Sequence, residues 1–376
     1  MIFTEDQELF RASVRDFAET VLAPAVPEIL ETGKVPREIY KQAGELGYPG
    51  LNVPEEFGGP GCGQVEVAIL FEELARVSPG FALSIELALV SNNIIRSSER
   101  LTEKYLEGVM NGDILLAGAA TDPKGQPNGA EWDPFIKKVE GGYIANGTRL
   151  YSTNSDCDLC YVVGSDEEGN VKAIFIEKGW EGFEQHPFDK KLGQAGNGGG
   201  TQTFKDVFVP EENVAEMAVG TSETYYTVYD GCAAEALGCI RGLYEKTMEF
   251  VENRTNAGRK LTDMTAVAYN IAEIRSKIYM CESMVYDVAQ HQDAAQATGD
   301  AALTQKWYEM AESVKMRVGE MLMDCAKDLL KLNGGLGYHE PMVWRFVGDQ
   351  LNYCMMDLTT EIHLGSMAML MGYLKG

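Results

Sequence analysis

The chain has 376 residues, of which 45% are hydrophobic and 24% are charged, and this composition predicts a folded protein of roughly two or three domains. Acidic residues number 57 against 32 basic ones, and a net charge of −25 repels nucleic acid and anionic membrane surfaces. No run approaches the roughly 18 to 20 consecutive apolar residues of a membrane span. The cysteine usage and a start without a basic and apolar leader predict a cytoplasmic protein.

Residues 1–113 are expected to form an N-terminal helical domain. Apolar side chains recur at steps of three and four residues in two stretches, Val14, Phe17, Val21 and Leu22, and then Val67, Leu70, Phe71, Leu74 and Val77. Between these stretches, Val53–Gly61 is too rich in proline and glycine for a helix.

Residues 114–218 are expected to form a middle domain of antiparallel strands, either a barrel or a sandwich. Short runs of β-branched and aromatic residues are bounded by Gly, Asp or Asn, as is typical of such domains. The runs are Tyr143–Thr148, Cys160–Val163, Val171–Ile176 and Phe204–Pro210.

Residues 219–376 are expected to form a C-terminal four-helix bundle, which makes the whole chain an α+β protein. Four long amphipathic stretches can bury their apolar stripes against one another in such a bundle. The stretches are Leu237–Val251, Ala266–Ala297, Ala301–Leu332 and Leu351–Leu374.

Several short motifs have plain structural readings. Cys157 and Cys160 have the spacing of a redox or zinc pair, but on a strand they would point to opposite faces, so we interpret them as structural. The four histidines lack metal-ligand spacing, and no metal site is expected. Glycine clusters at 58–59, 193–200 and 334–337 match neither dinucleotide-binding pattern, and either form turns or let the backbone approach a ligand closely.

The segment Met355–Glu361 is the most unusual part of the sequence. Asp357 follows two methionines in an apolar context, and burial raises the pKa of a carboxyl group towards the range that suits a general base. The alternative is that Asp357 caps the N-terminus of a helix.

In their order and spacing, nine motifs resemble those of the acyl-CoA dehydrogenase family along essentially the whole chain. They are Pro54-Glu55-Glu56-Phe57-Gly58-Gly59, Thr121-Asp122-Pro123, Asn146-Gly147-Thr148, Ser152-Thr153-Asn154, Lys191-Leu192-Gly193, Phe204-Lys205-Asp206-Val207, Ala236-Leu237-Gly238, Arg254-x-x-x-Gly258 and Gly334-Gly335-x-Gly337-Tyr338. The resemblance implies FAD as cofactor, an acyl-CoA thioester as substrate and an electron-transfer flavoprotein as redox partner. It also implies a homotetramer built as a dimer of dimers, with FAD lying across a subunit interface.

The resemblance assigns roles around the flavin ring. Thr121 and Thr153 would hydrogen-bond the ring, and Tyr151 would take the place of an aromatic residue that packs against it. Thr359 matches a threonine that contacts FAD.

Three further residues would act from a neighbouring subunit or permit close approach. Arg254 would reach the FAD pyrophosphate of the neighbour, and Gly334 and Gly335 would let the backbone approach the cofactor closely. The alternative is that Arg254 and the basic residues near it are solvated surface charge.

In the family a carboxylate removes the α-proton of the thioester, and this position falls on Asp357. The family residue is usually Glu followed by Gly-Thr, whereas here Asp357 is followed by Leu358. Asp is shorter by one C–C bond, about 1.5 Å. Relatives that oxidise alicyclic acyl-CoAs, such as cyclohexanecarboxyl-CoA, also use Asp, so a ring-bearing acyl group such as cyclohexanecarboxyl or cyclohexenecarboxyl is expected.

A second carboxylate, Glu86, lies in an apolar helical stretch at a position that lines the acyl pocket in some relatives. Glu86 would orient a polar acyl end or act as a second acid or base, unless it faces solvent. Branched- and long-chain relatives use a glutamate on the first helix of the C-terminal domain as an alternative base. That position is Val228 in this chain, and Asp230 and Glu235 lie nearby but out of register.

Departures from the family pattern leave other functions open. The loop Lys124–Asn128 differs from the family sequence and places Pro127, which has no hydrogen to donate, where a hydroxyl is expected. Ala257 and Gly348 replace an aromatic residue and an arginine. Besides dehydrogenation, the chain could therefore serve as an enoyl-CoA reductase, or as a desulfinase, another lyase or a binding subunit.

Overall fold

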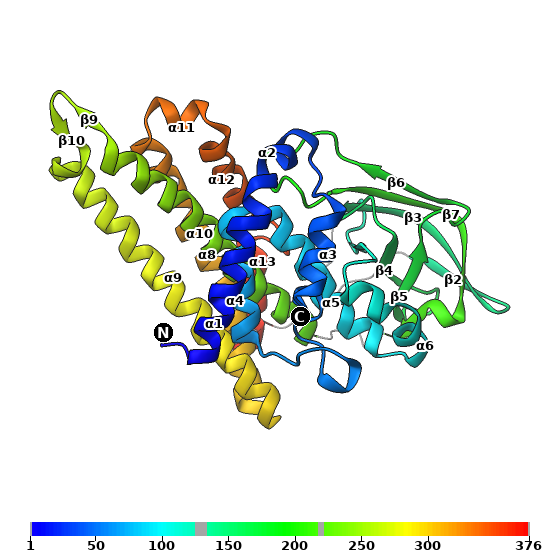
Figure 1. Ribbon diagram of the computed structural model, residues 1–376. Helices are drawn as coiled ribbons and strands as arrows, with labels where there is room; N and C mark the ends of the chain where they lie inside the picture. The colour runs from blue at the N-terminus through cyan, green and yellow to red at the C-terminus, as the bar shows by residue number, and fades with distance from the viewer. Residues whose placement is uncertain (1, 125–133, 217–221, 375–376) are drawn as a thin grey trace.

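The computed structural model describes residues 2–124, 134–216 and 222–374, and its elements follow the expected order of helices, strands and helices. In Figure 1 the N-terminal helices lie between the long C-terminal helices on the left and the sheets on the right. Within the described residues, no helix combines the length and apolar character that a membrane crossing requires. The altered loop residues 125–128, with Pro127, and the expected domain boundary at 218 lie outside the described residues.

The N-terminal helices pack around a pair of almost fully buried helices, α4 and α5. Pro79 occupies the first turn of α5, where its missing N–H costs no hydrogen bond. The expected apolar stripes are buried in the core, including Val14 and Phe17 of the first and Leu70 and Leu74 of the second. The helices are α1 (Glu5–Phe17), α2 (Ala23–Thr32), α3 (Arg37–Glu45), α4 (Gln64–Val77), α5 (Pro79–Arg96), α6 (Glu99–Leu101) and α7 (Glu107–Met110).

The middle part is a sandwich of two four-stranded sheets, which is one of the two expected forms. One sheet has the order β1-β4-β5-β8 and the other β2-β3-β7-β6, and a shared apolar core lies between them. The strands are β1 (Leu116–Ala119), β2 (Ile136–Val139), β3 (Gly142–Ser152), β4 (Leu159–Ser165), β5 (Val171–Glu177), β6 (Phe183–Pro187), β7 (Gly200–Pro210) and β8 (Val214–Glu216). The pair β1–β4 is parallel, unlike the expected antiparallel pairing.

Strand β4 is buried along its whole length because both of its faces are covered. One face contributes to the core between the sheets, and the other packs against a second core that includes Ile94 and Ile95 of α5. Double coverage explains why this strand has a continuous apolar sequence instead of an alternating one.

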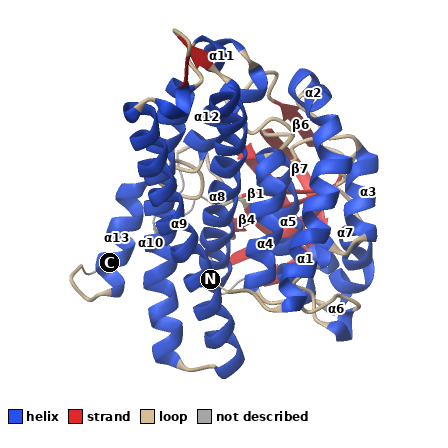
Figure 2. Cartoon of the chain, turned by 60° about the vertical axis from the view of Figure 1, so that its left-hand side comes forward, coloured by secondary structure: helices blue, strands red, loops and turns tan. Residues whose placement is uncertain are grey.

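The C-terminal part is the expected helical bundle, and Figure 2 shows its long helices standing side by side. Its elements are α8 (Ser222–Asn253), the hairpin β9 (Thr255–Asn256) and β10 (Arg259–Lys260), α9 (Thr265–Thr298), α10 (Ala301–Leu332), α11 (Gly335–His339), α12 (Pro341–Asn352) and α13 (Thr360–Leu370). The prediction of one continuous helix over Leu351–Leu374 is wrong. The chain leaves the helix after Asn352, and Asp357 (φ 48°) and Leu358 (φ 84°) then adopt left-handed backbone conformations that an α-helix excludes.

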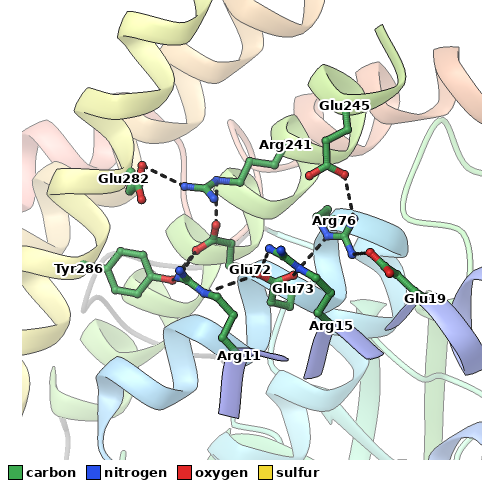
Figure 3. Close-up of polar contacts among 10 residues, drawn as sticks. All are labelled: Arg11, Arg15, Glu19, Glu72, Glu73, Arg76, Arg241, Glu245, Glu282 and Tyr286. Carbon is green, nitrogen blue, oxygen red and sulfur yellow. Dashed lines mark hydrogen bonds and ion pairs between the residues drawn. The ribbon is translucent and has the colours of Figure 1, made fainter. Parts of the chain in front are cut away.

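A buried ionic network joins the N-terminal helices to the bundle (Figure 3). Its centre is Glu72 and Glu73 on α4, both almost completely buried. Glu73 is bonded by Arg15 of α1 at 2.7 Å and by Arg76 at 3.3 Å, and Arg11 Nε lies 3.6 Å away.

The second central carboxylate, Glu72, connects α4 to two helices of the bundle. Glu72 pairs with Arg241 of α8 at 2.8 Å and accepts a hydrogen bond from Tyr286 of α9. Arg241 in turn pairs with Glu282 of α9 at 3.0 Å. Burial raises the pKa of Glu72, and the neighbouring Arg241 and Arg11 oppose this rise. The network therefore fixes α4 relative to α1, α8 and α9.

Candidate active site

A cavity of about 620 Å³ lies where α5, the ends of the β-sheets, α8 and the turn before α13 meet. It brings together predicted site residues that are far apart in sequence. These are Glu86, Thr121, Tyr151, Thr153, Asp357 and Thr359. Most of the remaining lining is apolar, and α5 and α8 contribute Leu87, Val90 and Val228 to it.

Asp357 occupies the turn that interrupts the last predicted helix. Asp357 is exposed, so the expected burial of its side chain is wrong, and its Oδ2 accepts a hydrogen bond from the buried thiol of Cys232 on α8 at 3.1 Å. The next residue is also tied to the bundle, because the Lys315 ammonium donates to the Leu358 carbonyl oxygen at 2.7 Å. The carboxylate is thus held at the cavity wall, and Asp357 does not cap α13, whose N-cap is Thr359.

Glu86 projects from α5 into the same cavity and is only 3% exposed. Its Oε1 has no hydrogen-bond partner among the described residues. Burial raises the pKa of Glu86 well above its usual range, and the nearby Glu235 and Asp357 raise it further. The interpretation of Glu86 as a solvent-facing residue is wrong, and its burial favours the neutral acid form.

Glu86 has room for its carboxyl group because residue 231 of α8 is glycine. A Cβ at Gly231 would collide with Glu86 Oε1. Four residues further along α8, Glu235 is completely buried, and burial also raises its pKa well above the usual range. Asp230 points elsewhere and accepts a hydrogen bond from Trp307 Nε1 at 2.8 Å.

Thr121 and Thr153 lie on neighbouring backbone segments at one wall of the cavity. Thr121 bridges to Leu150, whose N–H donates to the Thr121 carbonyl at 2.8 Å, and Thr153 bridges to Gly118. The Thr121 segment is anchored by Asp122, which pairs with the buried Arg149 at 3.2 Å.

Tyr151 stands at the mouth of the cavity, where it is 69% exposed and contacts the ring of Phe188 at a centroid distance of 6.2 Å. Its backbone is left-handed (φ 58°), and β3 is irregular between Arg149 and Ser152. Non-glycine residues in this conformation are strained and concentrate at functional sites. The irregularity turns the aromatic ring out of the sheet and towards the cavity.

Thr359 marks the N-terminus of α13, which opens at the cavity. Its extended backbone (φ −82°, ψ 163°) starts the helix, and its carbonyl accepts the first intrahelical bonds from Ile362 and His363. Free N–H groups at a helix N-terminus favour negatively charged groups such as a diphosphate.

The remaining predicted residues lie at one end of the bundle and not at this cavity. Arg254 directly follows α8 and leads into the hairpin β9–β10, while Gly334 and Gly335 connect α10 to α11 (Figures 1 and 2). Arg254 is exposed, and a Cβ at Gly334 or Gly335 would meet no atom of the same chain within 4 Å. Both features leave this end accessible to another molecule.

Cys157 and Cys160 are buried, but the prediction that they point to opposite faces of a strand is wrong. Strand β4 begins only at Leu159, and both sulfur atoms lie close to the Gln202 side chain. Among the described residues, no three His, Cys, Asp or Glu side chains gather in a way that could hold a metal ion.

The cavity as a whole fits a planar, largely apolar ring system such as a flavin. Its wall carries two threonine hydroxyl groups and an aromatic ring at the mouth, and a helix N-terminus lies beside it. A second cavity of about 570 Å³ adjoins it and shares Phe188, Lys191 and Gly199. Cys232, Glu235 and Lys315 were not predicted as site residues, because a cysteine, a glutamate or a lysine in a long amphipathic helix gives no signal in a single sequence.

Comparison with known proteins identifies matches along the whole chain. Residues 4–113 match the family model "Acyl-CoA dehydrogenase, N-terminal domain", and residues 231–371 match "Acyl-CoA dehydrogenase, C-terminal domain". A short-chain specific acyl-CoA dehydrogenase of Clostridium acetobutylicum is 29% identical over 89% of this chain and 89% of its own length. The caffeyl-CoA reductase-Etf complex subunit CarC of Acetobacterium woodii is 27% identical over 90% of both chains. A solved glutaryl-CoA dehydrogenase from Mycobacterium smegmatis in complex with FADH2 has a TM-score of 0.90 at 21% identity, covering 98% of this chain and 95% of that one.

Proposed function

This chain belongs to the acyl-CoA dehydrogenase family of FAD-dependent oxidoreductases, and we propose that it removes the α-proton of an acyl-CoA thioester with the carboxylate of Asp357. Bound FAD supplies the acceptor for the hydride that leaves the β-carbon, so that the product is an enoyl-CoA. The observation that carries the proposal is the position of Asp357 at the wall of the cavity that Thr121, Tyr151 and Thr153 also line.

The chain's own residues would hold the cofactor as follows. Thr121 and Thr153 would hydrogen-bond the flavin ring, and Tyr151 would pack against it. Thr359, at the N-terminus of α13, would contact the cofactor as well. Arg254, Gly334 and Gly335 would complete the site of a neighbouring subunit, which agrees with their place at the accessible end of the bundle.

We further propose that the acyl group carries a ring, as in cyclohexanecarboxyl-CoA or cyclohexenecarboxyl-CoA. Aspartate is about 1.5 Å shorter than glutamate, so the α-carbon must lie closer to the backbone of the turn. The apolar lining from Leu87, Val90 and Val228 offers space for a compact, wide acyl group. The second candidate function is the reverse reaction, the reduction of an enoyl-CoA. The similarity to the caffeyl-CoA reductase subunit favours it.

The substrate proposal is tested with a panel of acyl-CoAs mixed with the protein without oxygen. The alicyclic thioesters are expected to bleach the flavin absorption faster than straight-chain thioesters of equal carbon number. Aryl thioesters are included as a second ring class, and enoyl-CoAs are mixed with the reduced protein to measure the reverse direction. Preference for a straight chain would contradict the ring proposal, and bleaching by none of them would contradict the dehydrogenase proposal.

Glu86 is proposed to act as a neutral acid that donates a hydrogen bond to a polar atom of the acyl group. Because glutamine has the same shape and also donates, Glu86→Gln is expected to keep kcat/KM within about threefold, whereas Glu86→Leu is expected to lose about tenfold for acyl groups with a hydrogen-bond acceptor. Steady-state kinetics of both variants check this, with Glu107→Gln on α7 as an exposed control. A large loss in Glu86→Gln would instead assign Glu86 as a second acid or base.

The proposed assembly is a homotetramer that passes electrons to an electron-transfer flavoprotein. Large apolar side chains are exposed on α9 and on and after α13, and such patches mark protein interfaces. They include Tyr269, Tyr279, Met280, Leu364, Met369 and Tyr373. One relative is named as a subunit of an Etf complex, which supports the redox partner. A cytoplasmic location is proposed because all eight cysteines are free thiols.

A further inference from the structure

The turn that carries Asp357 has an unfavourable backbone conformation. Asp357 and Leu358 are consecutive and both left-handed, with φ values of 48° and 84°. Asparagine, aspartate and glycine tolerate this region, but a leucine side chain crowds the backbone there. Such a conformation persists only where the surrounding structure imposes it.

Lys315 on α10 is the group that holds this turn from the bundle side. Its Nζ donates to the Leu358 carbonyl oxygen at 2.7 Å, and the residue is only 3% exposed. A buried ammonium group is costly unless acceptors and opposite charges surround it. The direct acceptor belongs to the strained residue itself, so that the bond is lost if the turn relaxes.

The charged and titratable groups around Lys315 come from every element packed against it. They are Cys232 on α8, Cys354 and Asp357 in the turn, and Glu312 on α10. Glu312 is also in hydrogen-bond contact with the buried His363 of α13. Burial lowers the pKa of Lys315, and the four acidic neighbours oppose this effect.

Asp357 has a different set of neighbours. Its carboxylate accepts from the Cys232 thiol, and the buried acids Glu86 and Glu235 lie on its other side. Lys315 is the cation among these groups, and it contacts the turn through the Leu358 carbonyl.

We propose that Lys315 is a positioning residue for proton abstraction, which fixes the Asp357–Leu358 turn through the Leu358 carbonyl. This inference rests on the proposed function of Asp357 as the base. A purely structural lysine would affect folding alone, whereas a positioning lysine also sets the rate of proton removal in the folded protein.

The test measures proton abstraction without oxidation. Phenylacetyl-CoA and 3,3-dimethylbutyryl-CoA have α-hydrogens but no β-hydrogen that can leave as hydride, so deuterium uptake from heavy water, followed by mass spectrometry, reports the base alone. The variants are Lys315→Met, the double variant Lys315→Met/Leu358→Gly, and the control Lys327→Met, an exposed lysine of the same helix paired with Asp324. Thermal unfolding and flavin absorbance are recorded for each of them.

Lys315→Met is expected to lower the exchange rate by about ten- to a hundredfold, since a displacement of about 1 Å is enough for such a loss. In the double variant, Leu358→Gly relieves the strained turn and is expected to recover part of the rate. Lys327→Met is expected to match the wild type.

An unchanged exchange rate in a folded Lys315→Met protein would overturn the inference and leave the proposed base intact. If Lys315→Met does not fold, the double variant decides, because its turn is less strained, and a full wild-type rate there would overturn the inference. Absence of exchange in the wild type with both thioesters would overturn the proposed function and this inference together.

Discussion

Asp357→Asn is expected to lower flavin reduction by an acyl-CoA by about 10²- to 10⁴-fold, the usual contribution of a positioned general base. Asparagine keeps the size of the side chain and can still accept the hydrogen bond from Cys232, so the turn is expected to remain in place. The amide cannot take up the α-proton. Rapid mixing without oxygen measures the loss, and an unchanged flavin spectrum shows that the cofactor site is intact.

The control for this substitution is Asp328→Asn, which removes an aspartate of α10 that forms an exposed ion pair with Lys331 at 2.9 Å. It is expected to retain the full rate. Full turnover in Asp357→Asn would show that the base lies elsewhere, and Glu86 would then be the first candidate because it shares the cavity.

The largest effect on stability is expected from Glu73→Gln, which removes the carboxylate that Arg15 and Arg76 bind and Arg11 approaches. Breaking one partner of a buried ionic network leaves uncompensated charge, and such changes cost about 3 to 5 kcal/mol. Glutamine fills the same space, so the loss reflects charge and not a cavity. Urea denaturation followed by circular dichroism measures the free energy of unfolding.

The matched control is Glu245→Gln at the edge of the same network. Glu245 is 51% exposed and binds only the outer side of Arg76, at 2.8 Å, so its loss is expected to cost less than about 1 kcal/mol. Equal effects of the two substitutions would show that the network does not fix the N-terminal helices to the bundle.

Much of the fold could be predicted because the apolar periodicity changes twice along the chain, from helical to alternating and back. The parallel pairing of β1 with β4 could not, since strand pairing is a long-range property that local sequence does not encode. The break after Asn352 also gave no signal, because its left-handed residues are Asp357 and Leu358 instead of glycine. The domain division at residues 113 and 218 stays a prediction.

The candidate site could be predicted in part because short motifs that resemble those of the family mark individual side chains. Thr121, Thr153 and Asp357 are such residues, and they line one cavity despite their separation in sequence. Lys315 was missed because its position on an amphipathic helix indicates a solvated side chain, and only the packing of α10 against the turn buries it. Arg254 does not line the cavity of its own chain, and its proposed role requires a second copy.

The missing side chain at residue 231 has an evolutionary consequence. Glycine inside α8 weakens the helix by about 1 kcal/mol relative to alanine, and this chain accepts that loss where the Glu86 carboxyl group is seated. Positions 86 and 231 are therefore expected to vary together among homologues, with an acid at the first only where the second is glycine. With alanine at residue 231, an acid at residue 86 would have to turn the end of its side chain away from this position.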